Sequence, residues 1–322
     1  MSTTFMQSRQ SPSMAMGYAF GMTMALGAAT SFAMARAGAL RGLAPEDMIF
    51  ARAAVAGLVM LPFLIKWGLP KLAGIGWRRG LVLLLTGGPL FAFLQTGGYA
   101  FAPLAHGAVI APSTVTILST IGAVVLLGER LTGWHVAGGL TVIAGVVLVS
   151  WHGFMGNAVA DTVWIGDLMF VASSILWAGF TILMRKWRID PVRATAVVAV
   201  LTAVIVVPGY LAHSGFGRLA SLPADALLAQ GLVQGLIQGV VTMLAYSKAI
   251  AILGVSRAVL FPAIVPAISI LIGIPLVGEW PDATQIAGLC LVTFGLLAAV
   301  GLIGRIATAL RPAPTIMSPA LT

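Results

Sequence analysis

The sequence predicts an all-α integral membrane protein with ten transmembrane helices, arranged as two inverted five-helix repeats. Three observations support this fold class. Of the 322 residues, 59% are hydrophobic and only 8% are charged, whereas soluble domains carry about 25% charged residues. The apolar residues fall into ten long runs, and part of the first half recurs in the second half at a constant offset.

Each apolar run is long enough to cross a hydrocarbon core of about 30 Å, which takes about 20 helical residues. Transmembrane β-strands are only about ten residues long and alternate in polarity, so these uniformly apolar runs favour helices. The first run resembles a signal peptide, but the repeat requires it as the partner of the sixth run, so we expect it to be retained. The expected spans are 15–37, 46–66, 79–99, 104–127, 132–151, 163–185, 192–212, 228–250, 255–277 and 283–304.

The repeat has a fixed offset of 150 residues, for example from Ala108 to Ala258. Each half holds five runs, an odd number, so the two copies face opposite ways across the membrane. Inverted repeats are typical of transporters, whose halves exchange inward-open and outward-open shapes around one central site. We therefore expect two domains at 15–151 and 163–304, with cytoplasmic tails at 1–14 and 305–322. The identical positions in the first copy are Ala108, Val109, Pro112, Ser119, Leu126, Gly128, Glu129, Ala137, Gly138, Val142 and Gly145.

Glu129 and its repeat partner Glu279 each stand just before the last run of their half. The inverted topology places them on opposite faces of the membrane, so one ion site cannot use both. We expect both to be structural, capping helix ends or tethering loops. The glycines that follow them are expected to pack the fifth and tenth helices together.

The basic residues orient the array. With a cytoplasmic N-terminus, fourteen of the 18 lysines and arginines lie on the cytoplasmic side, and only Arg36, Arg41 and Arg218 lie outside. Such an excess is typical of cytoplasmic loops. We expect a multi-pass membrane protein with both termini in the cytoplasm. Arg52 is left inside the second run, where a charge is costly and usually functional, and its role stays open.

Several function classes are disfavoured by missing motifs. No basic patch interleaved with aromatic residues points to nucleic acid, and no G-x-x-x-x-G-K-[ST] motif points to ATP hydrolysis. The four histidines are scattered and no HExxH motif occurs, so a membrane-embedded enzyme, a metal site or a cofactor is not expected. A channel would not by itself require inverted repeats. Cys290, the single cysteine, is expected to be a buried thiol.

Motifs in both halves point to a known family. Each half has a GE followed by a helix with A-G-x-x-x-x-x-x-G, Trp177 lies within SSILWAGFTILMRKW, and Arg52 lies within FARAAVAGLVMLP. With the stretch 246–295, these features make the chain resemble the ten-helix, two-domain (EamA-like) exporters of the drug/metabolite transporter superfamily, from about residue 15 to 304. Small multidrug pumps of that superfamily carry a glutamate in the first helix. The run 15–37 has no acid, so a proton-coupled cation pump of that kind is disfavoured.

The resemblance implies a secondary transporter that exports small metabolites, with the lipid bilayer and a small-molecule substrate as its partners. The chain is similar to bacterial exporters of aromatic and neutral amino acids. Drugs or other metabolites, such as nucleotide-type or sugar-type solutes, are the alternative. The sequence leaves the oligomeric state open and is compatible with a monomer.

The eighth run carries candidate substrate-binding residues. Gln234, Gln238 and Thr242 recur at i, i+4 and i+8 and so share a helical face, with Tyr246 one turn further. Their amides could bind the ammonium and carboxylate of a zwitterion. They could equally hydrogen-bond between helices, which contributes about 0.6 kcal/mol on average in membranes.

Gln95, Tyr99, Trp177 and Thr181 are expected to complete the wall of the same pathway. Trp177 and Thr181 are four residues apart and share a face, and the indole could stack on an apolar or aromatic substrate. The alternative is packing or interface anchoring, the common roles of aromatic residues in membrane helices.

Pro112, Pro262 and Pro266 are candidate kink or gate positions early in the fourth and ninth runs. Proline removes a backbone donor and clashes with the preceding turn. In a membrane the freed carbonyl must face protein or a water-filled cavity. Pro112 and Pro262 are repeat partners, and the alternative reading is a simple proline near a helix start.

Overall fold

The computed structural model describes residues 13–128, 132–154, 162–258 and 260–299. These residues form helices and loops, and no strand occurs among them. Nine helical spans of at least 18 residues in this part of the chain are apolar enough to cross a membrane, and a shorter apolar helix covers Ala283–Ala299. The predicted all-helical, multi-pass membrane fold is confirmed.

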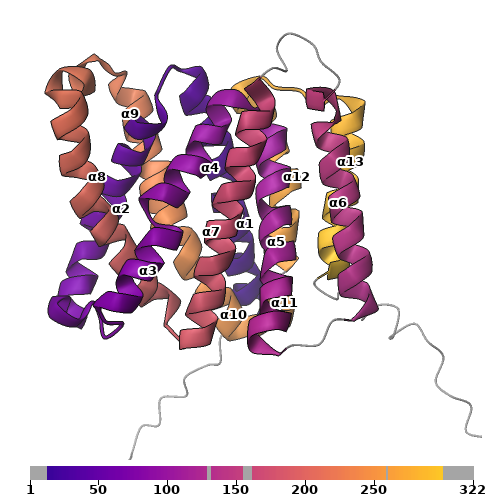
Figure 1. The fold of residues 1–322 in the computed structure, drawn as a ribbon, viewed down its shortest axis with the longest axis horizontal. Helices are drawn as coiled ribbons and strands as arrows, with labels where there is room; N and C mark the ends of the chain where they lie inside the picture. The colour runs from indigo at the N-terminus through magenta and orange to yellow at the C-terminus, as the bar shows by residue number, and fades with distance from the viewer. Residues whose placement is uncertain (1–12, 129–131, 155–161, 259, 300–322) are drawn as a thin grey trace, which may run out of the picture.

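The helices stand side by side, with α2, α8 and α9 at one end of the row and α6 and α13 at the other (Figure 1). The first half contains α1 (Met14–Leu40), α2 (Pro45–Trp67), the short 3-10 helix η1 (Leu69–Lys71), α3 (Trp77–Gly87), α4 (Pro89–Phe101), α5 (Leu104–Leu127) and α6 (Gly133–Phe154). The second half contains α7 (Val163–Trp187), α8 (Pro191–Ser221), α9 (Ala224–Gln230), the π-helix η3 (Gly231–Thr242), α10 (Met243–Leu253), α11 (Val255–Ala258), α12 (Leu260–Val277) and α13 (Ala283–Ala299).

The third and eighth spans differ from the continuous α-helices that the sequence predicts. The third is divided into α3 and α4 at Gly88, whose backbone is not helical (φ −96°, ψ −137°), and Pro89 begins the new helix. The eighth contains the 12-residue π-helix η3. π-Helical turns are rare in proteins, and those that occur are frequently found at functional sites. Both third spans, counted within their own halves, therefore depart from regular α-helix.

Glycine makes the close approach of η3 to α2 possible. A Cβ added to Gly235 would lie 2.8 Å from the Cβ of Val55 and 2.9 Å from the carbonyl oxygen of Arg52. Gly231 faces Val55 in the same way. Small residues of this kind let membrane helices pack closely, and here they join the second span of one half to the third span of the other.

The crossing of α6 and α13 shows the inverted symmetry of the halves. A Cβ added to Gly145 would lie 2.7 Å from the carbonyl oxygen of Gly288, and one added to Gly288 would lie 2.7 Å from that of Gly145. Gly138 and Gly295 face each other in the same manner. Because Gly288 and Gly295 are the repeat partners of Gly138 and Gly145, the two contacts are copies of each other in opposite directions. The predicted packing of the last helices by glycine is confirmed.

Other helix pairs follow the same exchange. α1 packs along α12, and α7, the first helix of the second half, packs along α5. Swapping the halves converts one pairing into the other. α2 and α8, the second helices of the two halves, pack on each other.

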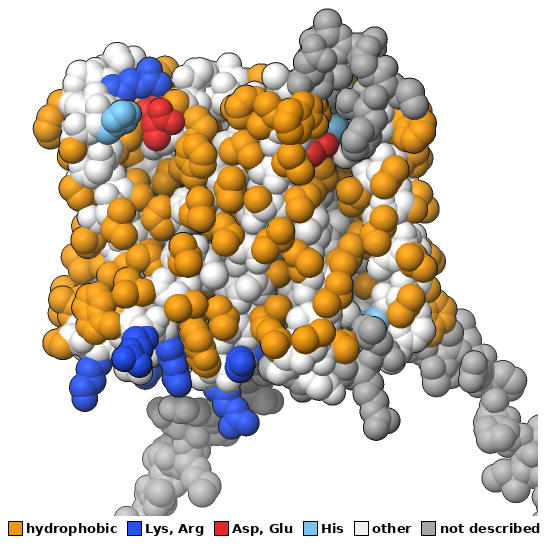
Figure 2. Space-filling view, viewed as in Figure 1, with side chains coloured by type: hydrophobic (Ala, Val, Ile, Leu, Met, Phe, Trp, Pro, Cys, Tyr) orange, Lys and Arg blue, Asp and Glu red, His pale blue; other side chains and the backbone are white. Residues whose placement is uncertain are grey.

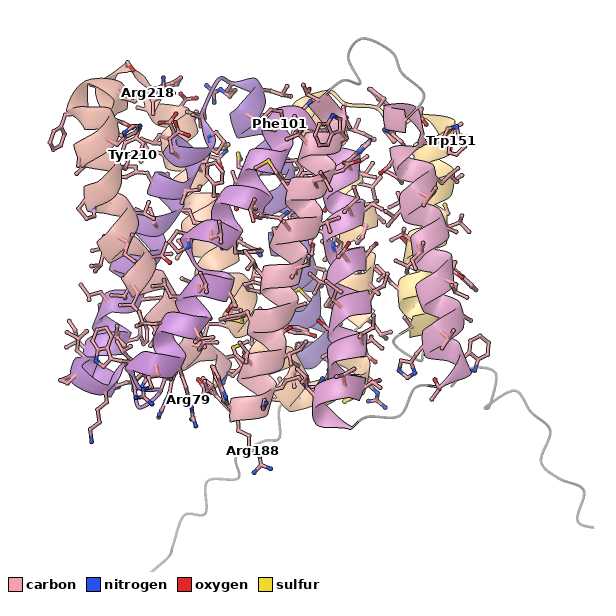
Figure 3. All side chains as sticks on the ribbon, in the orientation of Figure 1. Arg79, Phe101, Trp151, Arg188, Tyr210 and Arg218 are labelled. Carbon is pink, nitrogen blue, oxygen red and sulfur yellow. The ribbon has the colours of Figure 1, made fainter. Side chains whose placement is uncertain are left out.

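The flank of the molecule is apolar and one end is basic. Hydrophobic side chains cover the face in Figure 2, and Lys and Arg gather at the lower edge. Figure 3 places Arg79 and Arg188 at that end and Tyr210 and Arg218 at the opposite end. Exposed side chains such as Leu58, Val125 and Leu271 suit contact with lipid and not with water.

One prediction about the flank is wrong. Cys290 was expected to be buried, but its side chain is exposed on α13. The face that α13 turns inward carries Gly288, Val292 and Gly295 instead. An apolar run that faces lipid has no polar side to reveal its orientation, so the sequence does not distinguish its buried face from its exposed face.

Candidate functional site

Two glutamine–serine contacts join the halves. Gln234 of η3 accepts a hydrogen bond from the Ser31 hydroxyl of α1 (2.6 Å) and donates one from Nε2 to the Ser31 carbonyl (2.8 Å). Gln95 of α4 accepts from the Ser173 hydroxyl of α7 (2.8 Å). Each contact runs from the third span of one half to the first span of the other. Gln234 is thus engaged in a helix–helix bond, the alternative considered from the sequence.

Five other polar atoms on the third spans are buried without a hydrogen-bond partner among the described residues. A buried polar group without a partner costs about 1–3 kcal/mol, so each needs an explanation such as water or a bound solute. Three further atoms of this kind lie singly on α5, α8 and α13. The five atoms are Gln95 Nε2, Tyr99 Oη, Gln230 Oε1, Gln238 Oε1 and Thr242 Oγ1.

Gln95 and Tyr99 lie in an aromatic environment. The two residues lie one turn apart on α4, close to each other but without hydrogen-bond geometry between the amide nitrogen and the hydroxyl. The Tyr99 ring is fully buried and packs on Phe170 at 4.8 Å between centroids and on Phe32 at 6.5 Å. Aromatic rings therefore pack against the Tyr99 ring, and its hydroxyl is buried without a hydrogen-bond partner among the described residues.

Trp177 lies in the middle of an aromatic stack. The indole stacks on Phe91 of α4 (centroids 4.8 Å apart, 27° between planes) and on Phe180 (4.9 Å, 25°). The guanidinium carbon of Arg52 lies 6.0 Å from the Phe91 centroid. Trp177 is partly buried and stacks on both phenylalanine rings in this conformation.

The remaining predicted wall residues lie apart from one another. Thr181 donates to the Ala178 carbonyl (2.9 Å) and is 3.5 Å from the Ser119 hydroxyl of α5. Thr242 faces Gly27 of α1. Tyr246 is half-buried and packs against the cluster that joins α1, α10 and α12.

The three candidate gate prolines lie inside continuous helix. α5 runs from Leu104 to Leu127 through Pro112. The described helix α12, Leu260–Val277, contains Pro262 and continues through Pro266. The Thr116 hydroxyl donates to the Pro112 carbonyl (2.8 Å). Gating at these positions stays a prediction.

A polar network closes the end of the molecule opposite the basic end. Glu279 Oε1 accepts from Arg36 Nε (2.6 Å), and its Oε2 accepts from the backbone N–H of Leu104 at the start of α5 (2.8 Å). Arg36 also donates to the Tyr99 carbonyl (2.6 Å). Glu279 therefore caps a helix and tethers a loop, as predicted. Its repeat partner Glu129 lies outside the described residues.

His106 and Asp167 meet beside this network, although they lie 61 residues apart in the sequence. His106 Nδ1 is 2.9 Å from Asp167 Oδ1, joining α5 to α7, and the imidazole is almost fully buried. A cavity of about 290 Å³ opens nearby, lined by Pro103, Leu104, Glu279 and Trp280 among others. This cavity lies at the end opposite the basic end, and none of its lining residues belongs to the stack that contains Trp177.

Asp47 is the other buried acid at this end. It has no exposed surface and accepts from the Tyr210 hydroxyl (2.6 Å), from Arg218 (2.6 Å) and from the backbone N–H of Ala44 (2.9 Å). These bonds tie the start of α2 to the end of α8. Asp47 is therefore fully engaged without Arg52. In the part of the chain that the structure describes, no group of three or more His, Cys, Asp or Glu side chains is placed to hold a metal ion.

Comparison with solved structures supports the fold. A protein whose title reads "Crystal structure of protein" superimposes with a TM-score of 0.55, covering 91% of this chain and 99% of its own, at 19% identity. At that identity the likeness concerns the fold alone.

Two proteins described as transporters are similar in sequence. An uncharacterized transporter of Archaeoglobus fulgidus is 27% identical over 197 residues, which is 59% of this chain and 65% of that protein. The uncharacterized transporter YyaM of Bacillus subtilis is 27% identical over 189 residues, 58% of this chain and 61% of its own length. The chain thus matches less than two thirds of the length of each.

The family comparison covers both halves. The profile of the EamA-like transporter family matches residues 15–151 and 164–301, separately for each half. The two matches include every helix that contributes to the glutamine–serine contacts, to the aromatic stack and to the polar network around Arg36 and Glu279. This protein therefore belongs to the EamA-like transporter family.

Proposed function

We propose that the protein is a secondary transporter that exports small metabolites, with aromatic and neutral amino acids as its substrate class. Its two halves, 15–151 and 163–304, would exchange shapes around a shared pathway. The observation that carries the proposal is the set of partnerless polar atoms on the third span of each half. A solute with an ammonium and a carboxylate group supplies the donors and acceptors that these atoms lack.

The proposed binding residues follow from that observation. Gln95 Nε2 is a donor suited to a carboxylate oxygen, and Gln238 Oε1 is an acceptor suited to an ammonium group. Tyr99 and Thr242 each add a hydroxyl without a partner. Trp177 belongs to the apolar wall beside them, since its stack reaches from α4 to α7.

The other predicted residues receive supporting roles. Gln234 holds α1 against η3 through both of its bonds to Ser31. Thr181 and Tyr246 lie at the margins of the pathway. Pro112, Pro262 and Pro266 are retained as proposed gate positions because a helix with a missing backbone bond bends at low cost.

We assign the basic end to the cytoplasm of a bacterium and the end with Arg36 and Glu279 to the outside of its inner membrane. α1 ends and α13 begins close to the Arg36–Glu279 contact. The opposite ends of these two helices, which are the first and the last in the sequence, therefore lie on the basic side. Alkaline phosphatase fused after Thr322 is expected to be inactive, whereas a fusion in the turn at Pro223 is expected to be active. The opposite pattern would reverse the assignment.

Uptake into proteoliposomes tests the substrate class. Purified protein is expected to move labelled phenylalanine, tyrosine or leucine above the rate of empty liposomes, and runs with and without an imposed pH gradient separate proton coupling from facilitated transport. Trp177→Ala is expected to lower the rate while the protein still inserts. If wild-type protein moves no amino acid from a full panel, the substrate class is wrong, and a panel of drugs, nucleosides and sugars then tests the alternative.

A further inference from the structure

Arg52 is a positive charge within a transmembrane span. It lies seven residues after Pro45, the first residue of α2, so it sits about 10 Å along the helix from its outer end. Its side chain is only partly exposed. A charged side chain inside a membrane span costs about 2.5–3.5 kcal/mol on insertion scales and usually marks a pathway or a binding site.

Among the residues that the structure describes, none neutralises this charge. Arg52 makes no hydrogen bond or ion pair with any residue that the structure describes, and its one specific contact is the cation–π approach to Phe91. The nearest acid in sequence, Asp47, is occupied by Arg218, Tyr210 and Ala44. A cation–π contact contributes about 0.5–2 kcal/mol and leaves the five N–H donors of the guanidinium without acceptors.

The Arg52 guanidinium lies at one end of a stripe of side chains on α4. Phe91, Gln95 and Tyr99 follow one another at i, i+4 and i+8 on α4 and so share one face. The first contacts Arg52 and the other two carry polar atoms without partners. On its other side, the Arg52 backbone touches Gly235 of η3, the helix that contains Gln238. Arg52 therefore stands between the two third spans.

We infer that Arg52 binds the carboxylate of the substrate. A guanidinium presents parallel N–H donors that match a carboxylate in two short, charge-assisted hydrogen bonds. A bound carboxylate would supply the missing counter-charge, with Gln95 Nε2 as a further donor to it and Tyr99 placed to contact the rest of the substrate. The inference rests on the proposed function and adds that a free carboxylate is required for recognition.

The test compares an amino acid with its amide, which lacks the negative charge. The probes are L-phenylalanine and L-phenylalaninamide, and the readout is the ligand-induced shift of the thermal unfolding midpoint of the purified protein. Wild-type protein is expected to bind the amino acid at least tenfold more tightly than the amide. Arg52→Gln is expected to remove this preference, and Arg52→Lys, which keeps the charge without the planar fork, is expected to retain part of it.

Two control variants separate recognition from packing. Arg79→Gln removes the same group at the basic end, where Arg79 lies 5.6 Å from the Trp187 ring, and is expected to leave the preference unchanged. Phe91→Leu removes the ring beneath Arg52 and tests whether the cation–π contact alone explains its position. If Arg52→Gln keeps the tenfold preference, or if Phe91→Leu removes it equally, the assignment is overturned.

Failure of the proposed function gives a different pattern. Wild-type proteoliposomes that move no amino acid contradict the substrate class itself, and the Arg52 assignment falls with it. Wild-type transport combined with an unchanged preference in Arg52→Gln contradicts only the Arg52 assignment.

Discussion

At the residue scale, the sequence predicts which polar side chains lie inside the membrane, but not which of them find hydrogen-bond partners. Gln234 and Gln238 are four residues apart and look equivalent in the sequence. Gln234 is closed by Ser31, a residue 203 positions away on the other half, and Gln238 keeps a partnerless oxygen. Such long-range pairing depends on how the halves dock, which spacing within one helix does not encode.

This difference predicts opposite effects for the same substitution. Gln238→Leu is expected to lower transport at least tenfold while leaving thermal stability unchanged or higher, because it removes a buried oxygen without a partner. Gln234→Leu is expected to cost about 1–3 kcal/mol of stability, because it leaves the buried Ser31 hydroxyl without its acceptor. Transport and unfolding midpoints measured on both variants check this. A matching loss of stability in the two would contradict it.

Asp47 predicts a purely structural effect. Asp47→Ala leaves the Tyr210 hydroxyl and Arg218 without their acceptor, at a cost of about 2 kcal/mol, below the 3–5 kcal/mol of a fully buried pair because Arg218 is 41% exposed. Asp225→Ala is the matched control, since its ion pair with Arg41 is exposed (70% and 50%) and exposed pairs contribute little to stability. Equal unfolding midpoints for the two variants would show that the Asp47 network is not stabilising.

At the element scale, hydropathy predicts where spans lie but not how they are hydrogen-bonded. The fourth span, expected at 104–127, is α5 with those same bounds. The third and eighth spans were also placed, yet the break at Gly88 and the π-helix at Gly231–Thr242 were not foreseen. Lipid contact selects apolar residues in any helical geometry, and the glycines that permit these departures also occur as ordinary packing residues.

Two glycines of one helix provide a test of element packing. Gly145→Ala places a methyl 2.7 Å from the Gly288 carbonyl oxygen and 2.9 Å from the Val292 nitrogen, backbone atoms that move only if α6 and α13 separate. A loss of about 1–3 kcal/mol is expected. Gly139→Ala, on the same helix with no atom within 4 Å, is expected to be neutral or slightly stabilising. Thermal unfolding of both variants in the same detergent distinguishes them, and equal stability would show that the crossing tolerates a wider separation.

At the scale of the whole molecule, the constant offset predicts the inverted architecture, and the reciprocal glycine contacts of α6 and α13 agree with it. The sequence does not predict which contacts form at the two ends of the molecule. Arg36 is paired with Glu279 and Glu279 caps α5, so three segments of the two halves meet at the end opposite the basic end, which we propose to be the outer end. Contacts of this kind stabilise one state of an alternating-access cycle relative to the other.

Weakening the Arg36–Glu279 contact is therefore expected to open the outer end. Glu279→Gln keeps the size of the side chain but removes its charge, and a partly buried pair of about 1 kcal/mol corresponds to about a fivefold change in the equilibrium. The measurement uses a Cys290→Ser background, because Cys290 is the single cysteine, with Gln238→Cys as reporter. A membrane-impermeant maleimide added on the Glu279 side is expected to react about five times faster in Glu279→Gln than in its parent.

Glu46→Gln, which changes an exposed acid at the outer end of α2, is expected to leave the rate unchanged. Equal rates in the Glu279→Gln and Glu46→Gln proteins would mean that this ion pair caps α5 without controlling access to the pathway.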